Sequence, residues 1–218
     1  RTCIDIDTKA AAANLRALKK MTGKSSKILA VVKSNAYGHG LVEWSQLMER
    51  LHIDWLGVDS LVEGLALRKA GVRTPILVLG YTLPSLLVEA RRSHIAVTLS
   101  DREQWKAINA LPSSRNPLHV HLKVDTGMHR QGFQLRELPE VLLKLLELEH
   151  GKHMILEGMY THFAKAKDPH DRDALHRQHH EMEQWRDKLA EHNLRPIVHA
   201  GATGGALLLR PVLALFQE

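Results

Sequence analysis

The sequence predicts an α/β protein built as a (β/α)8 barrel, with a doubly wound open sheet as the alternative. Short runs rich in Val, Ile and Leu alternate with longer amphipathic segments along the 218 residues. Runs that are apolar throughout are typical of parallel strands buried on both faces, and the segments between them then serve as crossover helices. We expect one domain over residues 1–218, because no Pro-, Gly- or Ser-rich linker and no internal repeat indicates a second one.

Eight apolar runs are the candidate strands, and each has the length that strands usually have. In chain order they are 28–33, 54–59, 76–80, 95–99, 119–125, 156–163, 196–200 and 212–216. Between most of them lie helical patterns, at 41–51, 62–71, 84–93, 101–111, 137–149 and 173–192.

Local signals mark some ends of these elements. Asp101 with Gln104 predicts a capping box, and Gly71 predicts the end of a helix.

The stretch "GATGGALLLR" before the eighth strand is too short for a crossover helix, since a parallel connection needs about a dozen residues or more. We therefore expect either a barrel that is incomplete at this last crossover or a natural chain that is longer than this sequence.

Composition limits the function classes. The 30 Lys and Arg residues exceed the 24 Asp and Glu residues, which favours an anionic ligand, but the basic residues are scattered and do not indicate nucleic-acid binding. The single cysteine, Cys3, excludes an internal disulfide, fits a reducing compartment, and is expected to be buried within "CIDID". No apolar run approaches the roughly 20 residues of a membrane helix and no signal peptide is visible, so we expect a cytoplasmic protein. Because the sequence starts at Arg1 without Met, we also expect processing or trimming there.

Polar side chains gather where the predicted strands end, which is where barrel enzymes place their chemistry. A lysine at such an end often only reaches solvent, and Gly or Thr there often only forms a turn, but here many such residues would meet at one mouth. They are Lys33, Tyr37, Gly38 and Gly40 after the first strand, Lys123, Asp125, Gly127 and Arg130 at the fifth, His162 at the sixth, His199, Gly201, Thr203, Gly204 and Gly205 at the seventh, and Arg210 before the eighth.

This set suits a carbonyl cofactor that carries a phosphate. A partly desolvated lysine among other cations has a lowered pKa and becomes a nucleophilic amine that can form a Schiff base. Backbone N–H groups of "GATGG" and the Thr203 hydroxyl would bind the phosphate. An arginine against a ring nitrogen would keep that nitrogen unprotonated, because guanidinium does not give up its proton.

Three blocks of the sequence carry a resemblance to a known family. "AVVKSNAYGHG" at 30–40 resembles the pyridoxal-phosphate signature of alanine racemases, and "LKVDTGMHRQGF" and "EGMYTHFAKAKD" resemble two further blocks of that family. The similarity runs in order over nearly the whole chain. It implies a fold-type III enzyme that uses pyridoxal 5'-phosphate to interconvert L- and D-alanine, or serine as in a related branch. It also implies a cytoplasmic homodimer that supplies D-alanine for peptidoglycan biosynthesis.

The resemblance assigns roles to residues of this sequence. Lys33 would hold the cofactor as an internal aldimine and act as the base on one face of the substrate Cα. Tyr37 would bind the phosphate, Arg130 would lie beside the ring oxygen and the substrate carboxylate, and Lys123 would support Arg130 as an N6-carboxylysine. The remaining roles fall to Arg210 at the pyridine nitrogen, His162 near the ring, His199 holding Arg210, and a phosphate cup of Thr203 with the backbone at Val212 and Leu213. No metal is implied.

Three departures from the family pattern leave alternatives open. Ala202-Thr203 stands where the family usually has Asn-Ser, and the segment 203–210 is shorter than usual. The family's C-terminal β domain, which supplies the base on the opposite face, has no counterpart in this sequence. The alternatives are a non-catalytic pyridoxal-phosphate carrier of the same barrel fold and a fragment that has lost cofactor binding.

Overall fold

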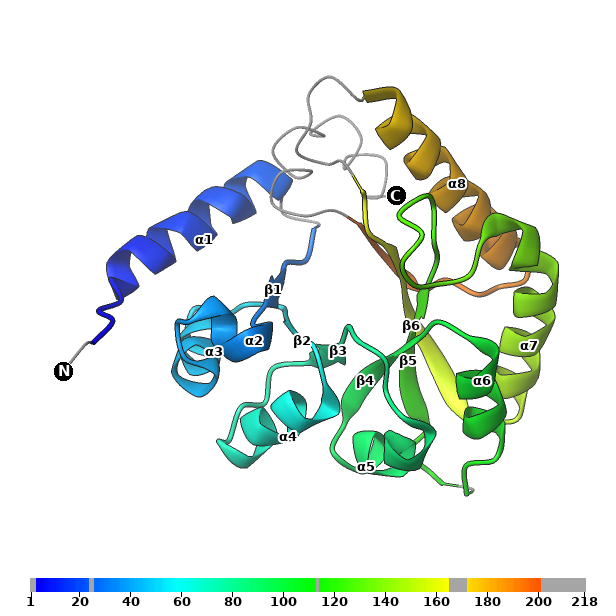
Figure 1. The fold of residues 1–218 in the computed structure, drawn as a ribbon, viewed down its shortest axis with the longest axis horizontal. Coiled ribbons are helices and arrows are strands. Elements are labelled where there is room, and N and C mark those ends of the chain that lie inside the picture. The colour runs from blue at the N-terminus through cyan, green and yellow to red at the C-terminus, as the bar shows by residue number, and fades with distance from the viewer. Residues whose placement is uncertain (1–2, 24–25, 113, 165–171, 201–218) are drawn as a thin grey trace.

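The computed structural model describes residues 3–23, 26–112, 114–164 and 172–200, which form a curved parallel sheet with helices around its outside (Figure 1). Within these residues the sheet has seven strands in the order β1 to β7, each parallel to the next. The strands are β1 Leu29–Val31, β2 Trp55–Val58, β3 Ile76–Val78, β4 Ile95–Leu99, β5 Leu118–Lys123, β6 Met154–Thr161 and β7 Ile197–Ala200. The predicted barrel-type α/β fold is confirmed, while the predicted strand at 212–216 lies outside the described residues.

Helices follow most strands, as the alternating pattern predicted. They are α2 Lys33–Tyr37, α3 Leu41–Arg50, α4 Leu61–Lys69, α5 Leu87–Arg92, α6 Arg102–Asn109, α7 Leu138–His150 and α8 Arg172–Glu191, with 3-10 turns η1 Pro84–Leu86 and η2 Leu135–Glu137. A further helix, α1 Thr8–Thr22, precedes β1, and the sequence analysis assigned no element there. It extends away from the rest of the described chain, and of its residues Leu15 is buried (Figure 1).

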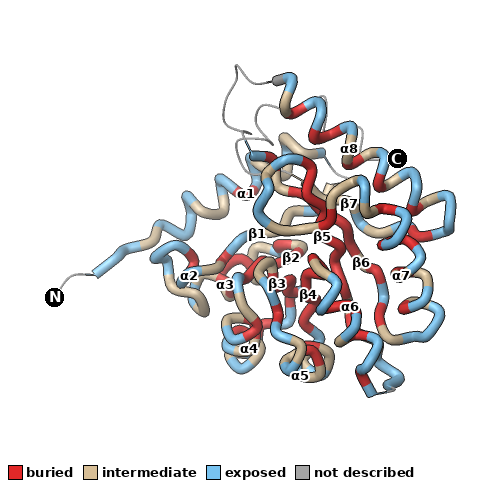
Figure 2. Tube along the Cα trace, turned by 45° about the vertical axis from the view of Figure 1, so that its right-hand side comes forward, coloured by how far each residue is buried: buried red, intermediate tan, exposed pale blue. Residues whose placement is uncertain are grey.

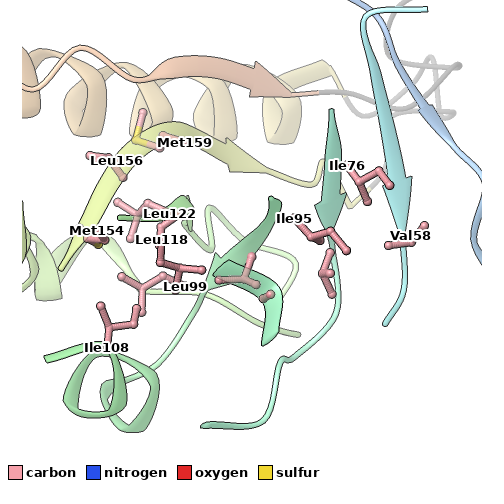
Figure 3. Packing of buried hydrophobic residues seen from close by; sticks show 14 of the residues in the cluster. Val58, Ile76, Ile95, Leu99, Ile108, Leu118, Leu122, Met154, Leu156 and Met159 are labelled. Carbon is pink, nitrogen blue, oxygen red and sulfur yellow. The ribbon is translucent and has the colours of Figure 1, made fainter. Parts of the chain in front are cut away.

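The main core lies between the outer face of the sheet and the surrounding helices (Figures 2 and 3). Leu99 and Leu118 from two strands lie beside Ile108 of α6, and each is at most 1% exposed. Trp185 of α8 is also fully buried. Burial of each such side chain stabilises the fold by about 1.5–3 kcal/mol, so this apolar layer fixes where the strand ends lie.

A second, smaller apolar cluster fills the inner face of the sheet. Trp55, Leu77 and Ala96 are buried there, with Leu29 and Leu79 packed against them. The neighbours of Trp55 and Leu77 along their strands, such as Leu56, belong to the outer core instead. Alternate residues of one strand therefore face different apolar layers, which explains why the strands read as continuous apolar runs.

Two expectations about local structure need correction. Cys3 is exposed, so its predicted burial is wrong, because residues 3–7 belong to no strand and lead into the projecting helix α1. Asp101 does cap α6 by accepting from the backbone N–H groups of Glu103 and Gln104. The Gln104 side chain completes no capping box, since it bonds Ser100 N at 2.9 Å and Thr98 O at 2.9 Å.

The predicted helix stop at Gly71 is confirmed, because α4 ends at Lys69 and Gly71 has a φ of 85°. In the described parts of the chain, no helix combines the length and the apolar character that a membrane crossing needs.

Candidate active site

The described site residues come together at the carboxyl ends of the strands. Lys33 follows β1, Lys123 is the last residue of β5, and His162 follows β6 directly. Register pairs Lys123 with Tyr160 of β6 and Tyr160 with His199 of β7, so these three side chains lie side by side on one edge of the sheet. The sequence predicted that Lys33, Lys123 and His162 would meet at the strand ends, but it did not single out Tyr160.

The charges at this edge act on each other. Burial lowers the pKa of His162, and the positive charges of Lys123, Arg130 and Lys33 lower it further. A histidine among three cations stays neutral more readily, and the same cations attract anionic ligands. The described part of the site is therefore positively charged.

The chain leaves β1 through a left-handed turn. Ser34, Asn35, Ala36 and Tyr37 have φ values of 53°, 56°, 50° and 53°, although none is glycine. The turn is held by Ala36 N donating to Val32 O at 2.8 Å and by Leu41 N donating to the Asn35 side chain at 2.9 Å. Left-handed residues other than glycine cost about 1–2 kcal/mol each, and such strain is found mostly at functional sites. The turn shortens the predicted first strand, which ends at Val31.

Lys123 is the most strongly perturbed amine at this edge. The residue is 4% exposed, and its Nζ lies 4.3 Å from the centre of the Tyr160 ring. Burial lowers the pKa of Lys123 to about 7, with a further contribution from Arg130 and an opposing one from Asp125. A large fraction of this amine is therefore neutral near pH 7.

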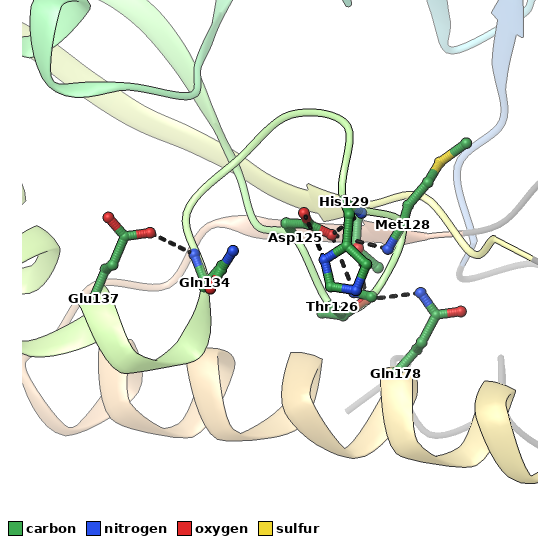
Figure 4. Close-up of polar contacts among 9 residues, drawn as sticks. Asp125, Thr126, Met128, His129, Gln134, Glu137 and Gln178 are labelled. Atoms are coloured by element: carbon green, nitrogen blue, oxygen red, sulfur yellow. Dashed lines mark hydrogen bonds and ion pairs between the residues drawn. The ribbon is translucent and has the colours of Figure 1, made fainter.

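The loop after β5 carries Arg130 and is folded around the Asp125 carboxylate (Figure 4). One carboxylate oxygen of Asp125 accepts from the backbone N–H groups of Gly127, Met128 and His129 at 2.9–3.0 Å. Phe133 closes the loop, since its N–H donates to Lys123 O and its carbonyl accepts from Asp125 N. Arg130 is exposed at the tip of a loop whose base is fixed.

The same loop is tied to its surroundings on two sides. Gln131 donates to Ser100 Oγ at 3.1 Å, and Thr126 shares a hydrogen bond of 2.8 Å with Thr161. Gln178 of α8 donates to Thr126 Oγ1 at 3.3 Å (Figure 4). The backbone from which Arg130 projects is therefore held by the residue after β4, by β6 and by α8.

A polar ladder lies on the inner face behind these residues. His199 Nε2 and His121 Nδ1 share a hydrogen bond of 2.8 Å, and the far nitrogen of His121 lies 3.7 Å from Glu157 Oε2. Tyr160 stacks on His199 with ring centres 4.7 Å apart and bonds Thr98 Oγ1 at 2.8 Å. His199 could be predicted from its place at a strand end, but its partners could not, because they come from other strands.

Burial and charge set the protonation of this ladder. Burial, with the charges of His121 and Lys123, holds the pKa of His199 well below its usual value, so His199 is neutral. Burial raises the pKa of Tyr160 to about 12, against smaller opposing effects of Thr98 and Arg130. Burial alone would raise the pKa of Glu157, but contacts with His119 and His121 lower it to about 2.

Several predicted residues cannot be located here. Thr203, Arg210, Val212 and Leu213 lie outside the described residues, and so do the glycines at 201, 204 and 205. Tyr37 is described and is 63% exposed on the left-handed turn.

Among residues 3–23, 26–112, 114–164 and 172–200, no cluster of three His, Cys, Asp or Glu side chains could hold a metal ion.

The described donor set fits a ligand with an aldehyde and anionic groups. Lys33 offers a primary amine whose side chain is 36% exposed, which a carbonyl carbon could reach. Lys123 and Arg130 contribute the positive charge that lowers the pKa of His162, and that charge would favour a phosphate or a carboxylate. Pyridoxal 5'-phosphate has this chemistry, so the residues present fit the predicted cofactor.

Comparisons with known proteins show the family of this chain. Residues 6–217 match the family described as "Alanine racemase, N-terminal domain". The chain is 37% identical to an alanine racemase of Symbiobacterium thermophilum over 214 residues, covering 96% of this chain and 55% of that protein. It is 38% identical to the alanine racemase of Geobacillus stearothermophilus over 167 residues, covering 77% of this chain and 42% of that protein.

Solved structures show the same fold. The Bacillus anthracis alanine racemase "with bound L-Ala-P" superposes with a TM-score of 0.84 at 32% identity, covering 93% of this chain and 52% of that one. The alanine racemase of D-cycloserine-producing Streptomyces lavendulae gives a TM-score of 0.86 at 28% identity, covering 95% and 54%. The chain thus spans about half the length of the relatives that it matches.

Proposed function

This chain belongs to the alanine racemase family, matching its N-terminal domain, and we propose that it is the cofactor-binding part of a racemase that interconverts L- and D-alanine. The observation that carries the proposal is the Lys33 amine at a strand end whose positive charge, with those of Lys123 and Arg130, acts on His162. The bound L-Ala-P of the Bacillus anthracis relative supports alanine as the substrate. The proposal extends to a cytoplasmic homodimer that supplies D-alanine for the cell wall.

Pyridoxal 5'-phosphate, when bound, accepts the electron pair that remains when the substrate loses its Cα proton. Lys33 would be the covalent attachment point, and its Nζ would take or return that proton. Arg130 orients the substrate carboxylate by a charged hydrogen bond, because its guanidinium projects from the fixed loop after β5. Tyr37 and Thr203 would bind the cofactor phosphate, and the backbone at Val212 and Leu213 would complete the phosphate site.

The remaining predicted roles belong to residues around the ring. His162 packs near the cofactor and stays neutral among the cations of the site. Arg210 would interact with the pyridine nitrogen, and His199 would hold Arg210. The neutral state of His199 supports this role, because a neutral imidazole that bonds His121 at one nitrogen can still accept a bond from a guanidinium at the other.

Lys123 supports Arg130 as N6-carboxylysine. Only a neutral amine attacks carbon dioxide, and burial makes the neutral form of Lys123 abundant near pH 7. The amine nitrogen forms a bond to the carbon of carbon dioxide and releases one proton to solvent, which leaves a carbamate anion. That anion would pair with the nearby Arg130 and replace a repulsion between two cations by an attraction.

Chemical trapping tests the proposal. Chain incubated with pyridoxal 5'-phosphate is reduced with borohydride and mapped by peptide mass spectrometry, and we expect the label on Lys33 and its loss in Lys33→Ala. Exchange of the Cα proton of L- and D-alanine in deuterated buffer then reports the chemistry, with L-serine as a comparison substrate. Label on another lysine would refute the assignment. Label on Lys33 without any Cα exchange would replace the racemase by a cofactor carrier.

A further inference from the structure

We propose that Asp59 is a positioning residue for Lys33, a role that rests on the proposed function of Lys33 as the attachment point. Lys33 Nζ donates to Asp59 Oδ1 at 2.9 Å, and the two side chains are 36% and 56% exposed. Asp59 directly follows β2 and Lys33 lies two residues beyond the end of β1, so the pair bridges two neighbouring strand ends. Asp59 thereby holds the Lys33 amine in a fixed direction until a carbonyl ligand arrives.

Glu63 builds the platform for this pair. Its two carboxylate oxygens accept from Asp59 N at 2.7 Å and from Ser34 N at 2.8 Å, so one side chain joins the residues after both strands. Glu63 itself lies in the first turn of α4, where its own N–H donates to the capping side chain of Ser60. The spacing between the Lys33 and Asp59 backbones is therefore set by α4 and does not depend on the ion pair.

The Asp59 backbone is also fixed from the next strand. Gly80 N donates to Asp59 O at 3.1 Å, and a Cβ at Gly80 would collide with that carbonyl. The main chain of Asp59 is thus held on two sides while its side chain is more than half exposed. A change of the Asp59 side chain should leave the fold intact, which makes the role testable.

The pair has a chemical consequence for cofactor attachment. An ammonium group cannot attack an aldehyde, so the contact with Asp59 must break and the proton must leave before Lys33 Nζ can form a bond to carbon. Lys33 and Arg130 both act electrostatically on His162, and neither Arg130 nor His162 offers Lys33 a negative charge that competes with Asp59. Exposed ion pairs are worth about 0.2–1 kcal/mol, so removing Asp59 should raise the reactivity of Lys33 by about 1.5- to 5-fold.

Competitive labelling of the cofactor-free chain measures that reactivity directly. Trace acetic anhydride is added, and acetylation of Lys33 is quantified by mass spectrometry relative to the exposed Lys106 of the same molecule. We expect Asp59→Asn to raise the ratio by about 1.5- to 5-fold, and Asp59→Glu to restore it at least in part. Glu147→Gln, which breaks the comparable ion pair with Lys144, should raise labelling of Lys144 and leave Lys33 unchanged.

Two further arms keep the outcomes distinct. In the unaltered chain, raising sodium chloride from about 0.05 to 0.5 M should screen the ion pair and raise the acetylation of Lys33 relative to Lys106. This measurement does not depend on whether a variant folds. Attachment of pyridoxal 5'-phosphate at Lys33 should be faster in Asp59→Asn by the same factor as acetylation. An unchanged Lys33 ratio in Asp59→Asn, or equal attachment rates, overturns the positioning role. Failure of the unaltered chain to take up the cofactor at Lys33 overturns the proposed function instead, and the acetylation arm still reports the ion pair.

Discussion

The buried amine of Lys123 makes a specific prediction about stability and pH. Its pKa falls from the usual 10.5 to about 7 in the folded chain, mainly through burial and then through Arg130. Between these two pH values the unfolded chain binds the proton that the folded chain has lost, so stability must rise with pH. At 1.36 kcal/mol for each pKa unit the full effect is about 5 kcal/mol, with an error of roughly 1–2 kcal/mol. The penalty is complete below pH 7 and fades as the pH approaches 10.5.

The substitution Lys123→Met isolates this effect because methionine is unbranched, similar in shape and never charged. Urea unfolding of both proteins is measured at several pH values from about 6.5 to 10 in buffers freed of carbon dioxide. The free energy of unfolding of the unaltered chain, taken relative to the variant, should rise by most of about 5 kcal/mol over this range. Lys106→Met, at an exposed position, should show no such trend. The buried-amine argument would be refuted if the difference in free energy of unfolding between the unaltered chain and Lys123→Met stayed constant within about 1 kcal/mol over this pH range.

Three other substitutions probe the support of the site. Gly158→Ala should lower stability by about 1–3 kcal/mol in urea unfolding, because its Cβ would collide with the His121 ring; equal stability would contradict that packing. Asp125→Ala should speed amide hydrogen exchange at Gly127, Met128 and His129, whose N–H groups lose their shared acceptor. Asp101→Ala, which removes a helix cap elsewhere, should leave those three amides unchanged. Trp185→Ala should cost about 3–5 kcal/mol, because this indole on α8 is fully buried, and a cost below about 1 kcal/mol would contradict its place in the core.

The order of strands and helices could be predicted because the central strands β2, β3 and β4 are buried on both faces. Apolar side chains face the helices on one side and the inner cluster around Trp55 on the other, so the strands stand out against the mixed polarity of the helices. The strand boundaries were predicted less accurately, since β5 and β6 begin earlier than the predicted strands at 119–125 and 156–163. Helix α1 was missed because its face carries little to bury, and of its residues Leu15 is buried.

The site could be predicted only in part, because the sequence shows each strand end separately. Lys33, Lys123 and His162 can be recognised because each is a charged residue or a histidine at the end of an apolar run. Their partners depend on which strand lies next to which, and at what register. His121 and His199 are 78 residues apart in sequence, and Lys33 and Asp59 are 26 apart. Those pairs follow from the register of parallel strands, which no local pattern in the sequence encodes.

The turn after Lys33 shows why local preferences could not have revealed the site geometry. Four consecutive left-handed residues other than glycine cost about 4–8 kcal/mol together, so propensity argues against that conformation. The cost is offset by contacts that exist only in the assembled fold: Ser34 N on Glu63, the Asn35 side chain on Leu41 N, and the burial of Ala36 to 3% exposure. Glu63 lies on the helix after the neighbouring strand, so its contact with the turn depends on the pairing of β1 with β2. The same carboxylate that stabilises the strained backbone also fixes Asp59 opposite the Lys33 amine, so the strain and the placement of the reactive group have a common physical cause.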